Sequence, residues 1–357
     1  MESENKELDF KNQQFSVGLD VHKKTWKVTI RTGGISLKTY SSNPSPEEVS
    51  EYMKKKYPGG DYHSVYEAGF CGYWAHRRLE KLGLKNIVVS PNEVPTNGKE
   101  RIYKNDSVDS GKLARELESG SIKGIYIPSQ LQQELRSLVR LRHQVMKSNV
   151  RLKNQIKSYL NFYGHKIPEN YETKHWSGVF IKYLRGLSFE YPIGKDQLEL
   201  YLEDYTQNRE MLAKVIKKIK SYIREYGLLE DVELLMSVPG IGYITAVTIY
   251  TELMDINRFS RLEELASYVG LSPAVSSSGD KENTLGLKTQ HNMYLRSLLV
   301  EAAWIAVRKD PALTLSFNEY LKRMSKQEAI IRIAKKLLNR IRTVWKKKTK
   351  YVSSVIK

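Results

Sequence analysis

Two aspartates, Asp106 and Asp109, stand three residues apart at the predicted start of a helix, in the stretch YKNDSVDSGKLAREL. Side chains three residues apart project from the same helical face, so the two carboxylates are expected to lie together. Acidic residues in a first turn also complement the helix dipole, so the pair alone does not establish a site. Other carboxylates must reach the same place before the pair predicts chemistry.

Two further acids belong to predicted strands. Phe15, Val17 and Leu19 alternate with other residues, so Asp20 lies on the opposite side of that strand from them. Glu67 ends a second strand, in the stretch SVYEAG. Two acids on strands and two on a helix can converge on one or two hard divalent cations, Mg²⁺ or Mn²⁺, which prefer oxygen ligands. A pair of such ions stabilises the attacking and leaving oxygens of a phosphodiester.

The elements that would position these acids follow one another as βββαβαβα. Alternating apolar residues predict the strands, and the first helix has Ser45 as its N-cap and Pro46 at its first position. We therefore expect an α/β domain over residues 1–128. Its expected strands are 15–20, 26–30, 35–39, 63–69 and 86–90, and its expected helices are 46–56, 72–83 and one that begins near 106.

A helical, coiled-coil-like region is predicted over residues 129–227. Apolar residues recur at steps of three and four, with Arg142 and Asn149 in two of the core positions. Two such helices pair either with each other or with another subunit, and we expect a homo-oligomer. The repeat is carried by Leu131, Leu135, Leu138, Val145, Leu152 and Ile156, and then by Tyr205, Leu212, Val215, Ile219, Tyr222 and Tyr226.

Residues 228–357 are expected to form a third, mainly helical region. Apolar segments flank a Pro-Gly-Ile-Gly turn at 239–242, and a loop rich in Ser, Gly, Asp and Asn is expected at 271–289. Residues 321–357 contain thirteen basic residues and one acidic residue, so a basic tail of about +12 is expected at the end of the chain.

The charge of the whole chain favours a nucleic acid as partner. Its 357 residues include 58 Lys and Arg against 40 Asp and Glu, a net charge of +18, which attracts a polyanion and releases its counterions. No apolar run approaches the length of a membrane span, and the acidic N-terminus shows no signal peptide. With Cys71 as the single cysteine, a cytoplasmic protein without a disulfide framework or a Cys-rich zinc site is the simplest expectation.

The arrangement of acids resembles the ribonuclease-H-like fold of the Holliday-junction resolvase RuvC over roughly residues 15–120. The stretches GLDVHKKTWKV, YEAG and KNDSVDSGKLA are similar, more specifically, to the DEDD-type transposases of bacterial insertion sequences, in the family numbered one hundred and ten. That resemblance implies a RuvC-like catalytic domain with a metal-binding tetrad. The tetrad, called the acid set below, is Asp20, Glu67, Asp106 and Asp109.

The C-terminal region carries a second part of the resemblance. In the family a serine nucleophile lies in a segment that contains GL-x-P and SG, and the alignment places that serine at Ser278. Ser276 and Ser277 stay open as alternatives because they are adjacent. Arg296 matches the arginine of the family's LR pair. The aligned residues are Gly270, Leu271, Pro273 and Gly279, whereas His291 before Asn292 departs from the Gly that the family often has there.

Two further stretches are expected to contact nucleic-acid backbone. The turn that contains Gly240 and Gly242 resembles a helix-hairpin-helix, in which glycine amides meet DNA phosphate without reading sequence. Three successive lysines of the basic tail, Lys346, Lys347 and Lys348, are expected to contact phosphate as well.

The resemblance implies an insertion-sequence transposase that cuts and rejoins donor and target DNA. In the family, the serine forms a phosphoserine link while the acid set of a different subunit holds Mg²⁺ or Mn²⁺, so a dimer, or a tetramer in the active complex, is expected. Some members use a structured noncoding guide RNA, the bridge RNA, to pair with both DNAs. A serine hydroxyl needs such activation because it is a poor nucleophile at its ordinary pKa.

Three alternatives stay open from the sequence. A site-specific DNA invertase of the same family has the same motifs, and the DNA that flanks the gene would separate it from a transposase. A RuvC-like structure-specific nuclease would use the acid set alone and leave Ser278 without a role. A noncatalytic nucleic-acid-binding scaffold would need the carboxylates only for structure.

Overall fold

The computed structural model describes residues 9–95, 106–171, 176–278, 281–287 and 291–353. The chain divides into two compact units, residues 1–127 and 128–357. Within the described residues, no helix is long and apolar enough to cross a membrane.

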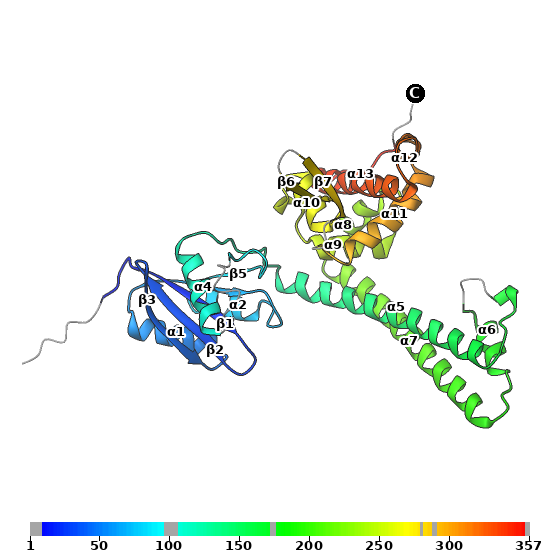
Figure 1. Ribbon diagram of the computed structural model, residues 1–357, viewed down its shortest axis with the longest axis horizontal. Coiled ribbons are helices and arrows are strands. Elements are labelled where there is room, and N and C mark those ends of the chain that lie inside the picture. The colour runs from blue at the N-terminus through cyan, green and yellow to red at the C-terminus, as the bar shows by residue number, and fades with distance from the viewer. Residues whose placement is uncertain (1–8, 96–105, 172–175, 279–280, 288–290, 354–357) are drawn as a thin grey trace, which may run out of the picture. The chain divides into compact units, whose positions relative to one another are not determined.

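Unit 1 is built on a five-stranded mixed sheet with the order β3-β2-β1-β4-β5 (Figure 1). β1 pairs antiparallel with β2 and parallel with β4, and β4 pairs parallel with β5. The predicted sequence of three strands, a helix, a strand, a helix and a strand is confirmed. The strands are β1 Gln14–Val21, β2 Trp26–Thr32, β3 Ile35–Ser42, β4 Asp61–Glu67 and β5 Lys85–Val89.

The helices of unit 1 are α1 Pro46–Lys56, α2 Trp74–Lys81 and α4 Asp106–Glu118. The Ser45 side chain accepts a hydrogen bond from the Glu48 amide, which confirms the predicted N-cap. α4 packs on β1, β2 and β4. A Cβ atom at Gly18 of β1 would lie 2.0 Å from the backbone oxygen of Ser110 and 2.5 Å from the amide nitrogen of Ala114. Glycine at this position therefore lets the helix lie directly against the sheet.

Unit 2 begins with two long helices, α5 Gln130–Phe162 and α7 Pro192–Glu225, which pair with each other within the chain (Figure 1). We call this pair the hairpin arm. One apolar cluster joins Leu135 and Val139 of α5 to Val215 of α7, and another joins Leu152 to Tyr205, so the helices run antiparallel. The short elements between them are η1 Glu169–Tyr171 and α6 Gly178–Arg185.

The rest of unit 2 is mainly helical, as predicted. Its helices surround a core that includes residues of the α5 base and of every α-helix from α7 to α13. The elements are α8 Leu229–Met236, α9 Tyr243–Leu253, η2 Ile256–Arg258, α10 Leu262–Val269, β6 Pro273–Ser278, β7 Lys281–Leu287, α11 Leu295–Lys309, α12 Pro311–Leu321 and α13 Lys326–Lys347.

One expectation for this region was wrong. The expected loop at 271–289 contains an antiparallel pair, β6 with β7, which we call the serine hairpin. Two residues, Gly279 and Asp280, separate its strands in the sequence, a composition typical of tight hairpin turns. The basic tail is largely helix α13, in keeping with the mainly helical region that was expected, and its apolar residues recur at helical spacing and are buried.

Candidate active site

Asp20 and Glu67 lie on neighbouring parallel strands. Leu19 of β1 pairs with Tyr66 of β4, so each acid directly follows the paired residue of its strand. Parallel neighbours are about 4.8 Å apart, which brings the two positions side by side. Gly18 faces α4, and side chains two residues apart share a sheet face, so Asp20 lies on the α4 side of the sheet.

α4 brings a third acid to this edge. Asp109 precedes Ser110, whose hydroxyl lies 2.9 Å from the Thr29 hydroxyl of β2 in the buried contact between helix and sheet. Farther along α4, the Glu118 carboxylate accepts a hydrogen bond of 2.8 Å from the Arg31 guanidinium. These two contacts fix the rotation of the helix, and with it the direction of Asp109.

Lys112 joins two members of the acid set. Its ammonium nitrogen lies 3.8 Å from Glu67 Oε1 and 3.7 Å from Asp109 Oδ1, so these two oxygens are within about 7.5 Å of each other. The Lys112 side chain is only 9% exposed. The structure thus places a cation between an acid of β4 and an acid of α4.

A histidine lies beside the first acid. His22 Nε2 is 3.2 Å from Asp20 Oδ2, and the imidazole is half exposed. Neither His22 nor Lys112 entered the sequence prediction. Lys112 could have been found, because it follows Asp109 by three residues and so shares its helical face.

The fourth acid is described only in part. Asp106 is the first residue of α4, but its side chain lies outside the described residues. Within the described residues, no group of three or more His, Cys, Asp or Glu side chains is arranged to hold a metal ion. The site as described therefore has Lys112 between Glu67 and Asp109, with Asp20 on the strand next to that of Glu67.

Ser278 is the last residue of β6 and pairs with Lys281 of β7. Ser276 and Ser277 pair with Asn283 and Glu282 in the same hairpin. All three serines have a described backbone, while their side chains lie outside the described residues.

The end of α10, just before the serine hairpin, is packed against Arg296. Gly270 ends α10 in the left-handed conformation with φ of 85°, and a Cβ atom there would meet the Arg296 guanidinium at 2.5 Å and His291 Cβ at 2.4 Å. Burial lowers the pKa of the Arg296 guanidinium. Asn292 donates a hydrogen bond of 2.8 Å to the fully buried Glu252 carboxylate, which also accepts two bonds of 2.7 Å from Arg140.

The predicted glycine turn lies between α8 and α9. Gly240 has φ of 89°, and its Cα packs against α11, where a Cβ atom would lie 2.4 Å from the Ala302 oxygen. Gly242 is the N-cap of α9 and has open space around it. Of the two, only Gly242 has the open space that the predicted phosphate contact requires.

The three predicted tail lysines differ in their surroundings. Lys346 donates a hydrogen bond of 2.8 Å to the Phe259 carbonyl, and Lys348 is paired with Asp231. Lys347 is exposed at the end of α13.

Comparisons with known proteins agree with this organisation. A family model for DEDD-type IS110 transposases, described as "Transposase", matches residues 17–165, which include the whole acid set. A second, described as "Transposase IS116/IS110/IS902 family", matches residues 232–317, which include the glycine turn and the serine hairpin.

Several curated relatives carry the same description. A putative transposase of Sinorhizobium fredii, y4qE, is 29% identical over 67% of this chain and 57% of its own length. The transposases of IS1111A from Coxiella burnetii and of IS1533 from Leptospira borgpetersenii are 26% and 28% identical, over 77% and 67% of this chain and 74% and 69% of their own lengths.

The two matched segments, in this order on one chain, define an insertion-sequence transposase. More narrowly, the chain belongs to the IS110 family, whose DEDD domain implies a divalent metal.

Proposed function

We propose that this protein cuts and rejoins DNA strands during transposition of an insertion sequence, using the acid set and a serine nucleophile. One observation carries the proposal. Glu67 and Asp109, far apart in the sequence, meet at Lys112 beside Asp20, within the segment that the DEDD-type model matches. The strand order, with β1 central and parallel to β4, supports a ribonuclease-H-like domain.

The residues fit a hard divalent cation. Carboxylates supply the oxygen donors that Mg²⁺ and Mn²⁺ prefer, and the ammonium group of Lys112 already lies between two of them. Asp20, Glu67, Asp106 and Asp109 would hold the metal, which when bound supplies charge neutralisation at the scissile phosphate and activates a hydroxyl. His22 orients the Asp20 carboxylate through their contact.

Ser278 is the proposed nucleophile. Its hydroxyl oxygen forms a bond to phosphorus while the bond from phosphorus to a deoxyribose oxygen breaks. Overall, the proton that serine loses is taken up by the leaving sugar oxygen. The phosphoserine link keeps the energy of the phosphodiester, so a second sugar hydroxyl can reverse the step and join a new strand.

We place the acid set and Ser278 of one site on different subunits of a homo-oligomer. The repeated apolar residues of the arm pack within the chain, because Leu152 is buried and Leu138 packs on the neighbouring cluster. Exposed apolar residues of the arm are better placed to meet a second copy. They include Phe162 at 83%, Ile193 at 78% and Leu200 at 66% exposure.

The partners follow from charge and family. The net charge of +18 suits donor and target DNA and a structured guide RNA, which share the same backbone anion.

Mixed subunits test the shared site. Ser278→Ala and Asp20→Asn proteins should each be inactive, and an equimolar mixture should regain part of the strand exchange, because one intact site can form from two chains. A mixture as inactive as its parts, although mixed oligomers form, would place serine and acids on one chain.

A DNA invertase is the second candidate. It is favoured by two relatives named pilin gene-inverting protein, from Moraxella bovis and Moraxella lacunata, which are 29% and 34% identical over 40% and 29% of this chain. Sequencing the products of a plasmid that carries the gene with its flanking DNA separates the two: new insertions indicate transposition, and reversal of a fixed segment indicates inversion.

A further inference from the structure

The hairpin arm has a gap in its apolar seam. One cluster ends at Val139 on α5 and Val215 on α7, and the next begins at Leu152 and Tyr205. A pocket of about 410 Å³ opens at this gap, within the size range of small-molecule sites. Its lining residues are Met146, Asn149, Val150, Lys153, Trp176, Ser177, Tyr205, Arg209 and Leu212.

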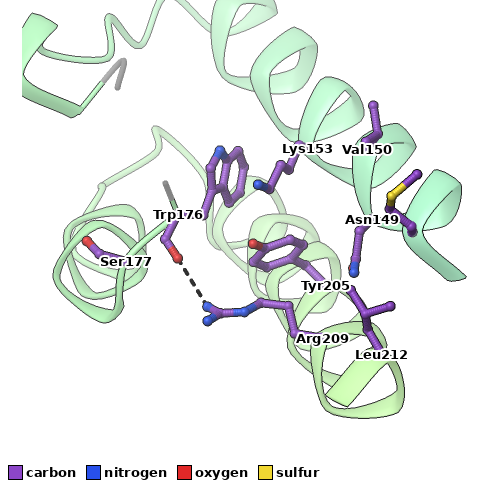
Figure 2. Close-up of a pocket in the computed structure, with 9 residues that line it drawn as sticks. Asn149, Val150, Lys153, Trp176, Ser177, Tyr205, Arg209 and Leu212 are labelled. Carbon is purple, nitrogen blue, oxygen red and sulfur yellow. Dashed lines mark hydrogen bonds between the residues drawn. The ribbon is translucent and has the colours of Figure 1, made fainter. Parts of the chain in front are cut away.

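Two cations and two aromatic rings form one side of the pocket (Figure 2). Lys153 Nζ lies 5.8 Å from the centre of the Trp176 ring and 5.7 Å from that of Tyr205. The Arg209 guanidinium lies 5.8 Å from the Tyr205 ring and donates a hydrogen bond of 3.1 Å to the Trp176 carbonyl. None of the described lining residues is acidic, so the pocket presents positive charge to an anion.

The pKa of Lys153 is lowered, chiefly by burial and then by the neighbouring positive charges of Arg209 and Lys157. Like charges that are held together over aromatic rings are stabilised when an anion binds between them. The arrangement is therefore suited to a phosphate group.

Asn149 supplies a second, independent sign of a ligand. It occupies a core position of the arm and is 7% exposed, yet its Oδ1 atom has no hydrogen-bond partner among the described residues. A buried polar atom without a partner destabilises the folded state. An Asn that only sets the register of two helices is expected to be paired, whereas this amide lies in the pocket wall beside Leu212 (Figure 2).

We propose that this pocket, the arm pocket, binds one unpaired nucleotide of a nucleic-acid strand. Lys153 and Arg209 hold its phosphate, the base enters among Met146, Val150 and Leu212, and the Asn149 amide bonds to the edge of the base. A duplex keeps its bases stacked inside, so the pocket selects a single strand or a flipped-out nucleotide. The inference rests on the family's action on DNA and not on the acid set or Ser278.

The test is binding of short, unstructured DNA and RNA strands of one sequence, and of the blunt DNA duplex, to the full-length protein without divalent metal. Lys153→Gln should weaken single-strand binding about fivefold or more and leave duplex binding within about twofold. Lys214→Gln is the matched control, because Lys214 is exposed and follows Tyr205 by nine residues on α7. This spacing puts the two side chains about 180° apart around the helix. Lys214→Gln should weaken single-strand and duplex binding equally and slightly.

Asn149→Leu is a second variant, which tests whether binding can be lost without loss of folding. It fills a core position with an apolar side chain, so the thermal midpoint should rise while single-strand binding falls. Loss confined to the RNA strand identifies a guide RNA as the source of the nucleotide, and loss confined to the DNA strand identifies DNA. Unchanged single-strand binding in both Lys153→Gln and Asn149→Leu would overturn the proposal. Asp20→Asn should keep this binding, so failure here is distinct from failure of the proposed recombination.

Discussion

The acid set and the serine hairpin, the two parts of the proposed active site, are positioned by different kinds of contact. The acids lie on a central strand, its parallel neighbour and a helix that packs on both, with Gly18 allowing contact at the backbone. The serine lies at the end of a two-stranded hairpin whose contacts run chiefly between its own strands. The backbone positions of the acids are thus set by the packing of unit 1, whereas that of Ser278 is set by its pairing with Lys281 in the hairpin.

Removing one carboxylate should have the largest effect. Asp20→Asn and Asp109→Asn are expected to lower strand cleavage by about a thousandfold or more, because the oxygen ligands of the metal are lost. The thermal midpoint and DNA affinity should stay close to those of the wild type. Gel assays of cleavage, read beside thermal melts, check this. Full activity in either variant would remove that carboxylate from the site.

Disrupting the contact between α4 and the sheet, instead of removing an acid, should lower the stability of unit 1. Gly18→Ala places a Cβ atom in the backbone of α4, so unit 1 is expected to lose about 3 kcal/mol and activity with it. Gly111→Ala is the matched control on α4, where a Cβ atom meets nothing within 4 Å, and it should gain up to about 1 kcal/mol. Denaturant melts of both variants give the comparison. Equal stability of the two would mean that the close helix–sheet contact does not hold the site.

Replacing Lys112 should affect the stability of the protein differently without and with bound metal. Without metal, Lys112→Met leaves Glu67 and Asp109 facing each other without their cation, so stability should fall by about 1 kcal/mol, a modest figure because both carboxylates are partly exposed. Added Mg²⁺ should stabilise this variant more than the wild type, as followed by thermal shift against metal concentration. The same metal response in both proteins would mean that the ion binds away from Lys112.

The sequence predicted unit 1 closely and unit 2 less so, for physical reasons. Alternating residues such as Phe15, Val17 and Leu19 are buried on one face of a strand, and this period is visible in the sequence. The serine hairpin has no such apolar alternation, and its Ser and Asn residues are as typical of a loop. The spacing of Lys112 from Asp109 is visible in the sequence, but its contact with Glu67 depends on the packing of α4 on the sheet.

The basic segment at the end of the chain is another case in which composition alone did not predict the packing. Thirteen basic residues suggested a tail, but the apolar residues between them, such as Ile333 and Leu337, are fully buried in the core of unit 2. Composition records the charge, whereas only the helical period of α13 separates its buried face from its exposed one.

The smallest expected effect therefore comes from charge removal on α13. Deleting the helix would unfold unit 2, so Arg332, Lys336 and Lys347, which are exposed, should be changed to Gln together. DNA affinity should fall for all sequences alike, and the slope of affinity against salt should drop by up to about 3. An unchanged slope would mean that this face does not meet phosphate.

The most direct test of the central claim is to map the covalent link between protein and DNA. A nicked DNA substrate that traps the intermediate should yield an adduct whose peptide carries DNA on Ser278. Ser278→Ala should remove the adduct at little cost in stability, while Ser276→Ala and Ser277→Ala should keep it. An adduct on Ser276 or Ser277 would shift the assignment by one or two residues. Cutting and rejoining of DNA with no adduct on any serine would contradict the account.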